Sequence, residues 1–243
     1  MASSGSEQDN PITIELAFAK KGIFDAIKGV PTGIKATTLR FFSHGEPTQE
    51  MDIIKECVEY ARSLNPTIRL ELQTNGLFQT TEDTEWIAKN FTAVWFSLDG
   101  PKEVNDKYRP DPDGYGRTSE IEENLKFVQK YTFAGIRSTI VEETMDKQDL
   151  LVDYYHNLGV KNICLNPLIK QIVRNESGNT EVTKDDIMLF SQYFLKAYKR
   201  GDAIGVTVLS SLTFNFDEKT AVACRSCLPM PQLNPDSSVS SVM

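Results

Sequence analysis

Cys224 and Cys227 have the C-x-x-C spacing that allows two thiolates to bind one metal ion or one iron of a cluster. The other two cysteines, Cys57 and Cys164, lie inside apolar runs, and we expect them to be small residues of the core. Four cysteines in 243 residues do not make a disulfide scaffold. All four fit a cytoplasmic location, which we predict.

Polar residues also follow directly after several apolar, strand-like segments. Such residues are the ones that bind ligands when parallel strands end at one edge of a sheet. Pro47 fixes φ, Gly45 allows backbone to approach a ligand, and Glu46 offers a carboxylate. The candidates are Ser43-His44-Gly45-Glu46-Pro47, Gln73-Thr74-Asn75-Gly76, Ser97-Leu98-Asp99-Gly100-Pro101, Arg137 and Asn166-Pro167.

Each of these candidates has a purely structural alternative. Gly, Pro, Asn and Asp after a strand are routine turn residues. Arg137 can pair with a nearby acid, and His44 suits packing in a loop as well as ligand binding. Asp111 to Gly116 lacks the spaced acids of a calcium loop, and the sequence has no glycine-rich phosphate loop, serine-hydrolase elbow or His/Asp/Glu metal cluster.

The elements that must position these residues alternate strictly along the chain. β-branched and aromatic runs predict strands, and apolar residues at helical spacing predict the helices between them. Strands begin at intervals of roughly 25 to 40 residues, the size of a β-α unit. We predict strands at 36–42, 68–73, 93–98, 134–141 and 162–166, and helices at 12–28, 48–64, 82–90, 119–131, 147–158 and 183–200.

This alternation predicts an α/β fold with a parallel sheet covered by helices. A full eight-fold barrel needs about 250 residues, and five strands indicate a partial parallel (β/α) barrel instead. We predict a disordered N-terminus at 1–10, a β/α core at 11–201 and a C-terminal extension at 202–243.

Charge and hydropathy exclude two classes of partner. The 26 basic and 34 acidic residues give a net charge of −8, which argues against binding the phosphate backbone of a nucleic acid. No run approaches the roughly 18 apolar residues that a membrane helix needs. We therefore expect neither nucleic acid nor a membrane as partner.

The order and spacing of five segments resemble the radical S-adenosylmethionine superfamily. The resemblance is greatest to its subgroup with a SPASM-type extension, which includes maturases of peptides and sulfatases. It runs from about residue 11 to residue 168 and extends weakly to the C-terminus. The segments are LRFFSHGEPT, LELQTNG, WFSLDGPKEVNDKYRP, IRSTIV and GVKNICLNP.

This resemblance implies a site for S-adenosylmethionine. Gly45, Glu46 and Pro47, together with Ser43 and His44, match the family's Gly-Gly-Glu-Pro element, whose backbone holds the amino group of the cofactor; His44 replaces the first glycine. Gln73, Ser97 and Arg137 fall where relatives contact the methionine and ribose parts, and Leu165 and Asn166 fall where the adenine is bordered. A guanidinium can bind a carboxylate or ribose oxygens through two donors.

The sequence departs from the family at the cluster. Relatives hold a 4Fe-4S cluster with C-x-x-x-C-x-x-C, which is absent here, and no strand precedes the predicted helix at Ile12. We therefore expect no cluster in this chain and expect the first strand to be missing, which leaves the strand at 36–42 with an unpaired edge unless a partner chain supplies that strand.

The C-terminal extension departs as well. Cys224 and Cys227 resemble the entry to an auxiliary-cluster region, and residues 234–239 resemble its Asp-Gly-x-Val turn. Serine replaces the glycine of that turn, and Val242 stands where a cysteine is expected. Two thiolates cannot fill a four-cysteine cluster, so we interpret this metal site as incomplete.

Three functions follow from these observations. The first is a radical S-adenosylmethionine protein whose intact relatives abstract hydrogen from a peptide or small molecule, with this chain truncated and inactive alone. The second is a binding module or remnant without a cluster, which keeps a pocket for adenosyl ligands or a peptide. The third is a conventional parallel-barrel lyase or aldolase, which lacks support because no lysine stands at a strand end.

Overall fold

The computed structural model describes residues 13–30, 33, 35–42, 45–168, 184–210 and 231–241. The chain divides into two compact units, each discussed by itself below. Unit 1 comprises Met1–Trp95, Phe127–Phe133 and Lys219–Met243, and unit 2 comprises Phe96–Lys126 and Ala134–Glu218. No helix in the described ranges is long and apolar enough to span a bilayer.

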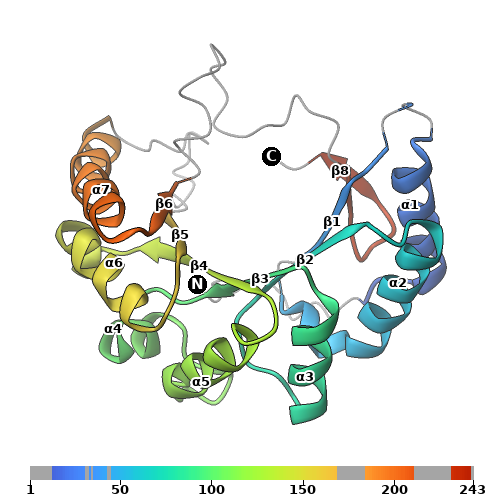
Figure 1. Ribbon diagram of the computed structural model, residues 1–243, viewed down its shortest axis with the longest axis horizontal. Coiled ribbons are helices and arrows are strands. Elements are labelled where there is room, and N and C mark those ends of the chain that lie inside the picture. Colours follow the sequence, from blue (N-terminus) through green and yellow to red (C-terminus); the bar gives the residue numbers. More distant parts are fainter. Residues whose placement is uncertain are drawn as a thin grey trace, which may run out of the picture. The chain divides into compact units, whose positions relative to one another are not determined.

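Helices and strands alternate along the chain, as Figure 1 shows. The helices are α1 (Leu16–Lys28), α2 (Met51–Leu64), α3 (Thr81–Asn90), α4 (Lys102–Tyr108), α5 (Thr118–Val128), α6 (Gln148–Asn157) and α7 (Lys184–Ile204), with 3-10 turns η1 (Pro47–Glu50) and η2 (Glu142–Lys147). The strands are β1 (Thr38–Phe41), β2 (Arg69–Thr74), β3 (Ala93–Ser97), β4 (Phe133–Ile140), β5 (Asn162–Pro167), β6 (Thr207–Leu209), β7 (Pro231–Leu233) and β8 (Val239–Ser241).

The six strands β1 to β6 follow chain order in one sheet, which confirms the predicted α/β class. The recorded pairs β1–β2, β4–β5 and β5–β6 are all parallel. At the ends of this order, β1 and β6 each have one neighbour among the described strands. The order of the described strands is therefore open, in agreement with a partial barrel.

The core of unit 1 forms between β2 and α2. Leu70 and Leu72 of β2 are fully buried, and the half-buried residues that alternate with them occupy the other face of the strand. Cys57 and Val58 belong to the buried stripe of α2, which confirms Cys57 as a core residue. Burial raises the pKa of the Cys57 thiol to about 11, so it stays protonated near neutral pH.

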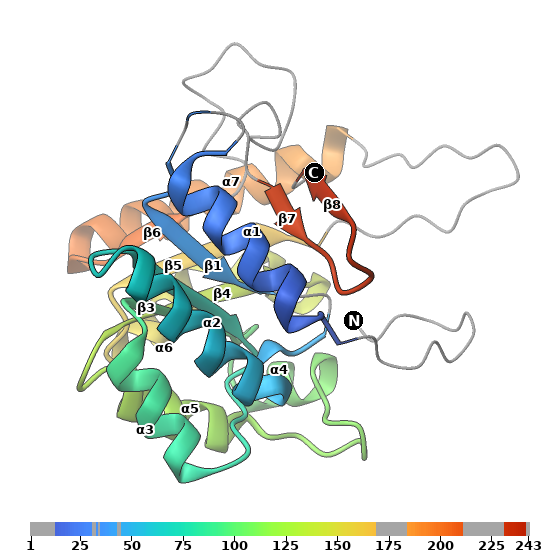
Figure 2. The same cartoon turned by 90° about the vertical axis from the view of Figure 1, so that its right-hand side faces the viewer.

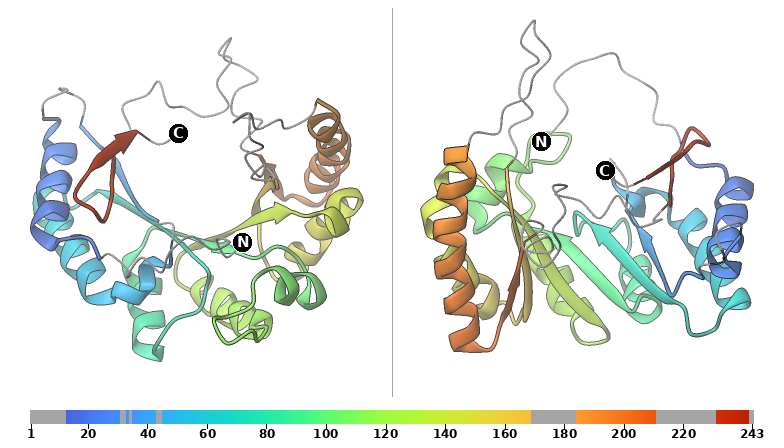
Figure 3. Two further views of the ribbon diagram at one scale, coloured as in Figure 1. Left: turned by 180° about the vertical axis from the view of Figure 1, so that it is seen from behind. Right: turned by 90° about the horizontal axis from the view of Figure 1, so that it is seen from above.

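In unit 2, α6 and α7 lie along β5 and β6, as the right-hand view of Figure 3 shows. The fully buried Tyr155 of α6 donates from its hydroxyl to the carbonyl oxygen of Leu98 at 2.8 Å. Burial raises the pKa of Tyr155 well above its ordinary value, and the Asp99 carboxylate acts in the same direction. Tyr155 therefore remains a neutral donor on the helix-covered face of the sheet.

Two elements of unit 2 were not predicted. The strand β6 has only three residues, which is too short to show alternation, and it pairs with β5 after the end of α7. The parallel pattern thus continues beyond Gly201, where the sequence predicted it to end. Helix α4 was predicted as loop because Val104 is its one aliphatic residue, so no apolar stripe marks it.

The C-terminal strands β7 and β8 form an antiparallel hairpin. Its turn is closed by the Asn234 amide, which donates to the Ser238 carbonyl oxygen at 3.0 Å. Ser237 has a φ of 63°, and it is the only residue other than glycine with a positive φ among the described residues. This left-handed conformation is the one that a glycine would adopt without strain, and Ser237 is the position at which, by sequence, a serine stands in place of a glycine.

The hairpin lies beside α1 in unit 1 (Figure 2). Leu233 of β7 packs directly over Gly22 of α1, so that a Cβ atom added at Gly22 would collide with the Leu233 side chain. Gly22 is therefore a glycine for reasons of space, even though glycine weakens a helix interior by roughly 1 kcal/mol relative to alanine.

We expect Gly22→Ala to release the hairpin from α1 while strengthening α1 itself. Hydrogen exchange should become faster for the amides of residues 231–241 and not for those of α1. The double variant Gly22→Ala with Leu233→Ala serves as the control, because the shorter side chain removes the collision. We expect exchange of the hairpin amides to be slower in the double variant than in Gly22→Ala. Unchanged exchange of the hairpin in Gly22→Ala would contradict the packing role of Gly22.

Candidate functional site

In unit 1, the Glu46 carboxylate joins the loop after β1 to the end of β2. Its Oε1 accepts hydrogen bonds from the Thr48 amide at 3.1 Å, the Thr48 hydroxyl at 2.8 Å and the Thr74 hydroxyl at 2.8 Å. Its Oε2 accepts from the Asn75 amide at 2.6 Å. Four donors therefore occupy this carboxylate, so its oxygens serve to hold the loop to the end of β2.

The candidate Gln73 lies on β2, next to Thr74. It shares the face of Glu71, because alternate residues of a strand point the same way. Glu71 forms an ion pair with Arg40, its register partner on β1, at 2.7 Å. This face of unit 1 is therefore polar, while Leu70, Leu72 and Thr74 are buried on the other. Ser43 and His44 lie outside the described residues.

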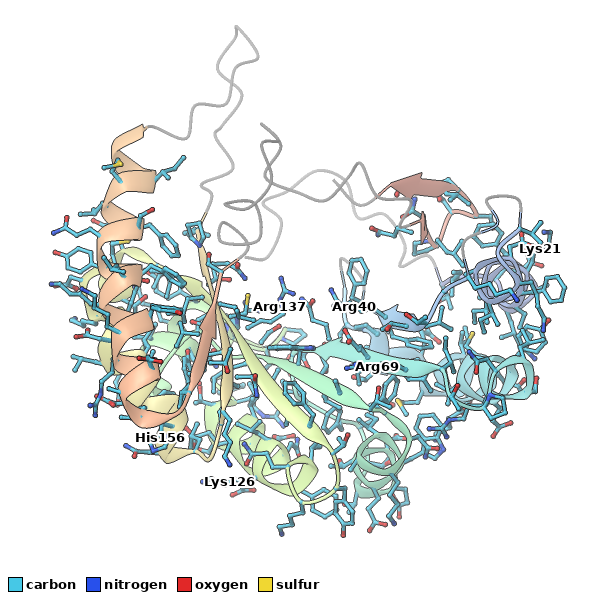
Figure 4. All side chains as sticks on the ribbon, turned by 45° about the horizontal axis from the view of Figure 1, so that its top comes forward. Lys21, Arg40, Arg69, Lys126, Arg137 and His156 are labelled. Carbon is cyan, nitrogen blue, oxygen red and sulfur yellow. The ribbon has the colours of Figure 1, made fainter. Side chains whose placement is uncertain are left out.

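In unit 2, Ser97 and Arg137 stand on adjacent strand ends. The Leu98 amide donates to the Arg137 carbonyl oxygen at 3.2 Å, which brings the end of β3 beside β4. Phe96 and Leu98 are fully buried, whereas Ser97 between them is half-buried, and Arg137 is likewise half-buried between the buried Ile136 and Ser138. Figure 4 shows Arg137 on the side of β4 away from α6 and α7. The structure thus places these two candidates together.

The Arg137 guanidinium has no carboxylate partner among the described residues. By contrast, Arg109 in the same unit pairs with Asp99, and Arg40 in unit 1 pairs with Glu71. A half-buried guanidinium without an acid retains its donors for an anionic or hydroxyl-rich ligand. The structural alternative for Arg137, pairing with a nearby acid, finds no support in the described residues.

Leu165 and Asn166 occupy opposite faces of β5. In the parallel register Leu165 is opposite Ser138 and Asn166 is opposite Thr139. Leu165 is fully buried and lies on the helix-covered face with Ser138, so only its backbone can reach a ligand on the face of Arg137. Asn166 is half-buried and shares that ligand face, where its Oδ1 accepts from the Cys164 thiol at 3.6 Å. Cys164 is itself buried, as predicted for a core residue.

Sequence reasoning missed the role of Asp99, which follows β3. Its carboxylate is nearly buried and accepts from Arg109 Nε at 2.6 Å, from Arg109 Nη2 at 3.2 Å and from the Thr139 amide at 2.7 Å. Its own amide donates to Asn105 Oδ1 at 3.0 Å, and Asn105 Nδ2 donates to Thr118 Oγ1 at 2.9 Å. An acid directly after a strand, with an arginine ten residues later, was the signal in the sequence.

The two groups of candidates lie in different units. Glu46 and Gln73 belong to unit 1, and Ser97, Arg137 and Leu165 belong to unit 2. Their convergence on one pocket stays a prediction. The predicted metal ligands Cys224 and Cys227 lie outside the described residues. Within the described ranges, no group of three or more His, Cys, Asp or Glu side chains could hold a metal ion.

Comparison with curated proteins identifies anaerobic sulfatase-maturating enzymes as relatives. The cysteine-type enzyme of Clostridium novyi (strain NT) is 26% identical over 136 residues, which cover 52% of this chain and 36% of that enzyme. The serine-type enzyme of Bacteroides thetaiotaomicron is 26% identical over 145 residues, which cover 57% of this chain and 34% of that enzyme. The similarity thus spans about a third of each relative. No protein-family model matches the chain.

Solved structures share the fold. A structure described as native anSMEcpe with bound AdoMet has a TM-score of 0.69 at 20% identity, and the match covers 91% of this chain and 62% of that one. Streptococcus suis SuiB bound to S-adenosylmethionine has a TM-score of 0.64 at 13% identity, with 97% and 54% covered. At such identities the likeness shows the fold, and it agrees with the partial radical S-adenosylmethionine barrel expected from the sequence.

Proposed function

We propose, on the premise that the chain belongs to the radical S-adenosylmethionine family and is sulfatase-maturase-like, that it binds S-adenosylmethionine at the carboxyl ends of its strands. The observation that carries this proposal is Arg137, a half-buried guanidinium on the helix-free face of β4 that has no acid partner among the described residues. Parallel β/α folds bind ligands at this edge of the sheet.

The residues of unit 2 fit the amino-acid and ribose parts of S-adenosylmethionine. Arg137 offers a planar set of donors for a carboxylate or ribose oxygens, and Ser97 beside it offers a hydroxyl that can donate or accept. Asn166 contributes an amide on the same face. When bound, S-adenosylmethionine supplies a sulfonium centre; these residues would hold its polar parts and fix its orientation.

The described residues do not fit a 4Fe-4S cluster. Such a cluster needs thiolates from several cysteines, and the described cysteines are Cys57 and Cys164, both buried and in different units. For this part of the chain we propose ligand binding without hydrogen abstraction. This reading supports the binding-module alternative as strongly as it supports a family enzyme.

For the substrate of a complete enzyme we propose a peptide. Two similar structures are described with peptides bound, anSMEcpe with a Kp18Cys peptide and SuiB with its precursor peptide SuiA. The proposal rests on those two proteins, and peptide binding by this chain can be tested separately from binding of the adenosyl ligand.

We expect S-adenosylmethionine to bind weakly, with a dissociation constant of roughly millimolar to high-micromolar. Charge-assisted hydrogen bonds contribute about 1.5–3 kcal/mol each, and the loss of translational freedom opposes them. About 1.4 kcal/mol corresponds to a tenfold change in affinity, so a few such contacts support a dissociation constant no lower than the high-micromolar range. An NMR titration of the labelled chain covers this range of affinity.

Methylthioadenosine, which lacks the amino-acid part, is the matched control ligand for this titration. It should bind more weakly than S-adenosylmethionine if Arg137 recognises the carboxylate. Equal responses to the two ligands would contradict recognition of the carboxylate by Arg137, and no response to either would refute the proposed site. A sub-micromolar constant would contradict the expected weakness and would instead establish a binding module that has no need of a cluster.

A further inference from the structure

The strand end that carries Arg137 is held to the end of β3 by two hydrogen bonds, one at Arg137 itself and one two residues later. The Leu98 amide donates to the carbonyl oxygen of Arg137 itself, at 3.2 Å. Two residues further along β4, the Thr139 amide donates to Asp99 Oδ1 at 2.7 Å. The second bond uses a side chain as acceptor, so the link between the two strand ends continues past the last residue of β3.

Asp99 can act in this way because the carboxylate is itself fixed. Its side chain is only 4% exposed and takes two hydrogen bonds from the Arg109 guanidinium. Its backbone amide is held by Asn105, which is fully buried, and Asn105 in turn donates to Thr118 at the start of α5. A buried carboxylate is costly unless its oxygens are paired, and here both oxygens accept from partners within unit 2.

We propose that Asp99 is a positioning residue for Arg137 and Ser97. By fixing the backbone two residues after Arg137, it helps to hold that guanidinium in one orientation on the face of β4 away from α6 and α7, next to Ser97. This inference rests on the proposed function for its ligand, but the effect of Asp99 on Arg137 exists in the free protein. A preorganised guanidinium binds more tightly because less side-chain freedom is lost on binding.

The test compares Asp99→Asn with Asp83→Asn in the full chain. Asparagine keeps the size of Asp99 but loses the charge that holds Arg109. Asp83 is the matched control, since it is a buried acid that pairs with Lys55 at 2.8 Å in unit 1 and has no part in the proposed site. Circular dichroism checks that both variants are folded, and urea unfolding measures how much stability each variant has lost.

The readout is the Nε–H resonance of Arg137 in the free protein, assigned as the signal that disappears in Arg137→Lys. We expect this signal to shift or broaden in Asp99→Asn and to stay unchanged in Asp83→Asn. We also expect the affinity for S-adenosylmethionine to fall roughly tenfold in Asp99→Asn alone. An unchanged Arg137 signal in folded Asp99→Asn would overturn the inference.

Failure of the proposed function gives a different result. In that case wild type shows no response to S-adenosylmethionine, while the Arg137 resonance still depends on Asp99. If Asp99→Asn does not fold, Arg109→Lys tests the positioning role instead. Lysine keeps the positive charge but cannot donate two parallel hydrogen bonds to the Asp99 carboxylate as arginine does. A displaced Arg137 signal in Arg109→Lys supports the positioning role, and an undisturbed one overturns it.

Discussion

Glu46→Ala is expected to lower the free energy of unfolding of unit 1 by about 3 kcal/mol or more, since each buried donor left unpaired costs about 1–3 kcal/mol. The substitution leaves the amides of Thr48 and Asn75 and the Thr74 hydroxyl without their acceptor. Thr74 is only 2% exposed, so water cannot easily replace the carboxylate there. Urea unfolding followed by circular dichroism measures the change.

Glu50→Ala is the matched control for this experiment. Glu50 lies in the same 3-10 turn, and the hydrogen bond that its carboxylate accepts comes from the exposed Thr13 hydroxyl. We expect a change within about 0.5 kcal/mol, as for most surface substitutions. Glu46→Gln should fall between the two, because its amide keeps one acceptor oxygen but cannot accept from the Asn75 amide at the other position. Equal stability of Glu46→Ala and Glu50→Ala would show that Glu46 does not join the two strand ends.

Arg137→Met should abolish the response to S-adenosylmethionine with little effect on stability. The guanidinium has no acid partner among the described residues, so its removal leaves no described carboxylate uncompensated. We expect the free energy of unfolding to change by no more than about 0.5 kcal/mol. The affinity should fall at least roughly tenfold, the loss of one charge-assisted contact. The NMR titration and urea unfolding measure the two quantities on the same sample.

Arg40→Met is the matched comparison, and we expect it to lower the free energy of unfolding, unlike Arg137→Met. Its partner Glu71 has a side chain only 13% exposed, and the ion pair joins register partners of β1 and β2. Removing Arg40 leaves that carboxylate without its cation, which should cost about 1–3 kcal/mol of stability. A large loss of stability in Arg137→Met would mean that this arginine has a structural partner and would contradict its assignment to the ligand.

The sequence predicted the alternation of helices and strands well because apolar periodicity reflects burial, and burial decides most of these elements. The buried stripe of α2 and the alternation in β2 are examples. Apolar periodicity does not predict α4, which lacks an apolar stripe, or β6, which has only three residues. These elements form because of contacts with residues far away in the sequence, which a local pattern of apolar residues cannot reveal.

The surroundings of the candidate residues depend on contacts that a local sequence pattern does not contain. Glu46 was predicted to offer its carboxylate, but partners 28 and 29 residues away, Thr74 and Asn75, occupy it, and only tertiary structure brings them together. Leu165 lies in a strand with three consecutive buried residues, so no alternation of apolar and polar residues indicates which face of the sheet it occupies. Ser97 and Arg137 could be predicted because each is a polar residue in an apolar strand.

The contact between Gly22 and Leu233 has a consequence for synthesis on the ribosome. Unit 1 is discontinuous in sequence, and both stretches of unit 2 are translated before β7. Helix α1 therefore emerges early and must wait, with Gly22 uncovered, until Leu233 has been added. Because a contact of such long sequence separation forms late and slowly, unit 2 can complete its folding on the nascent chain before unit 1 does. The last part of unit 1 to fold is thus set by the direction of translation.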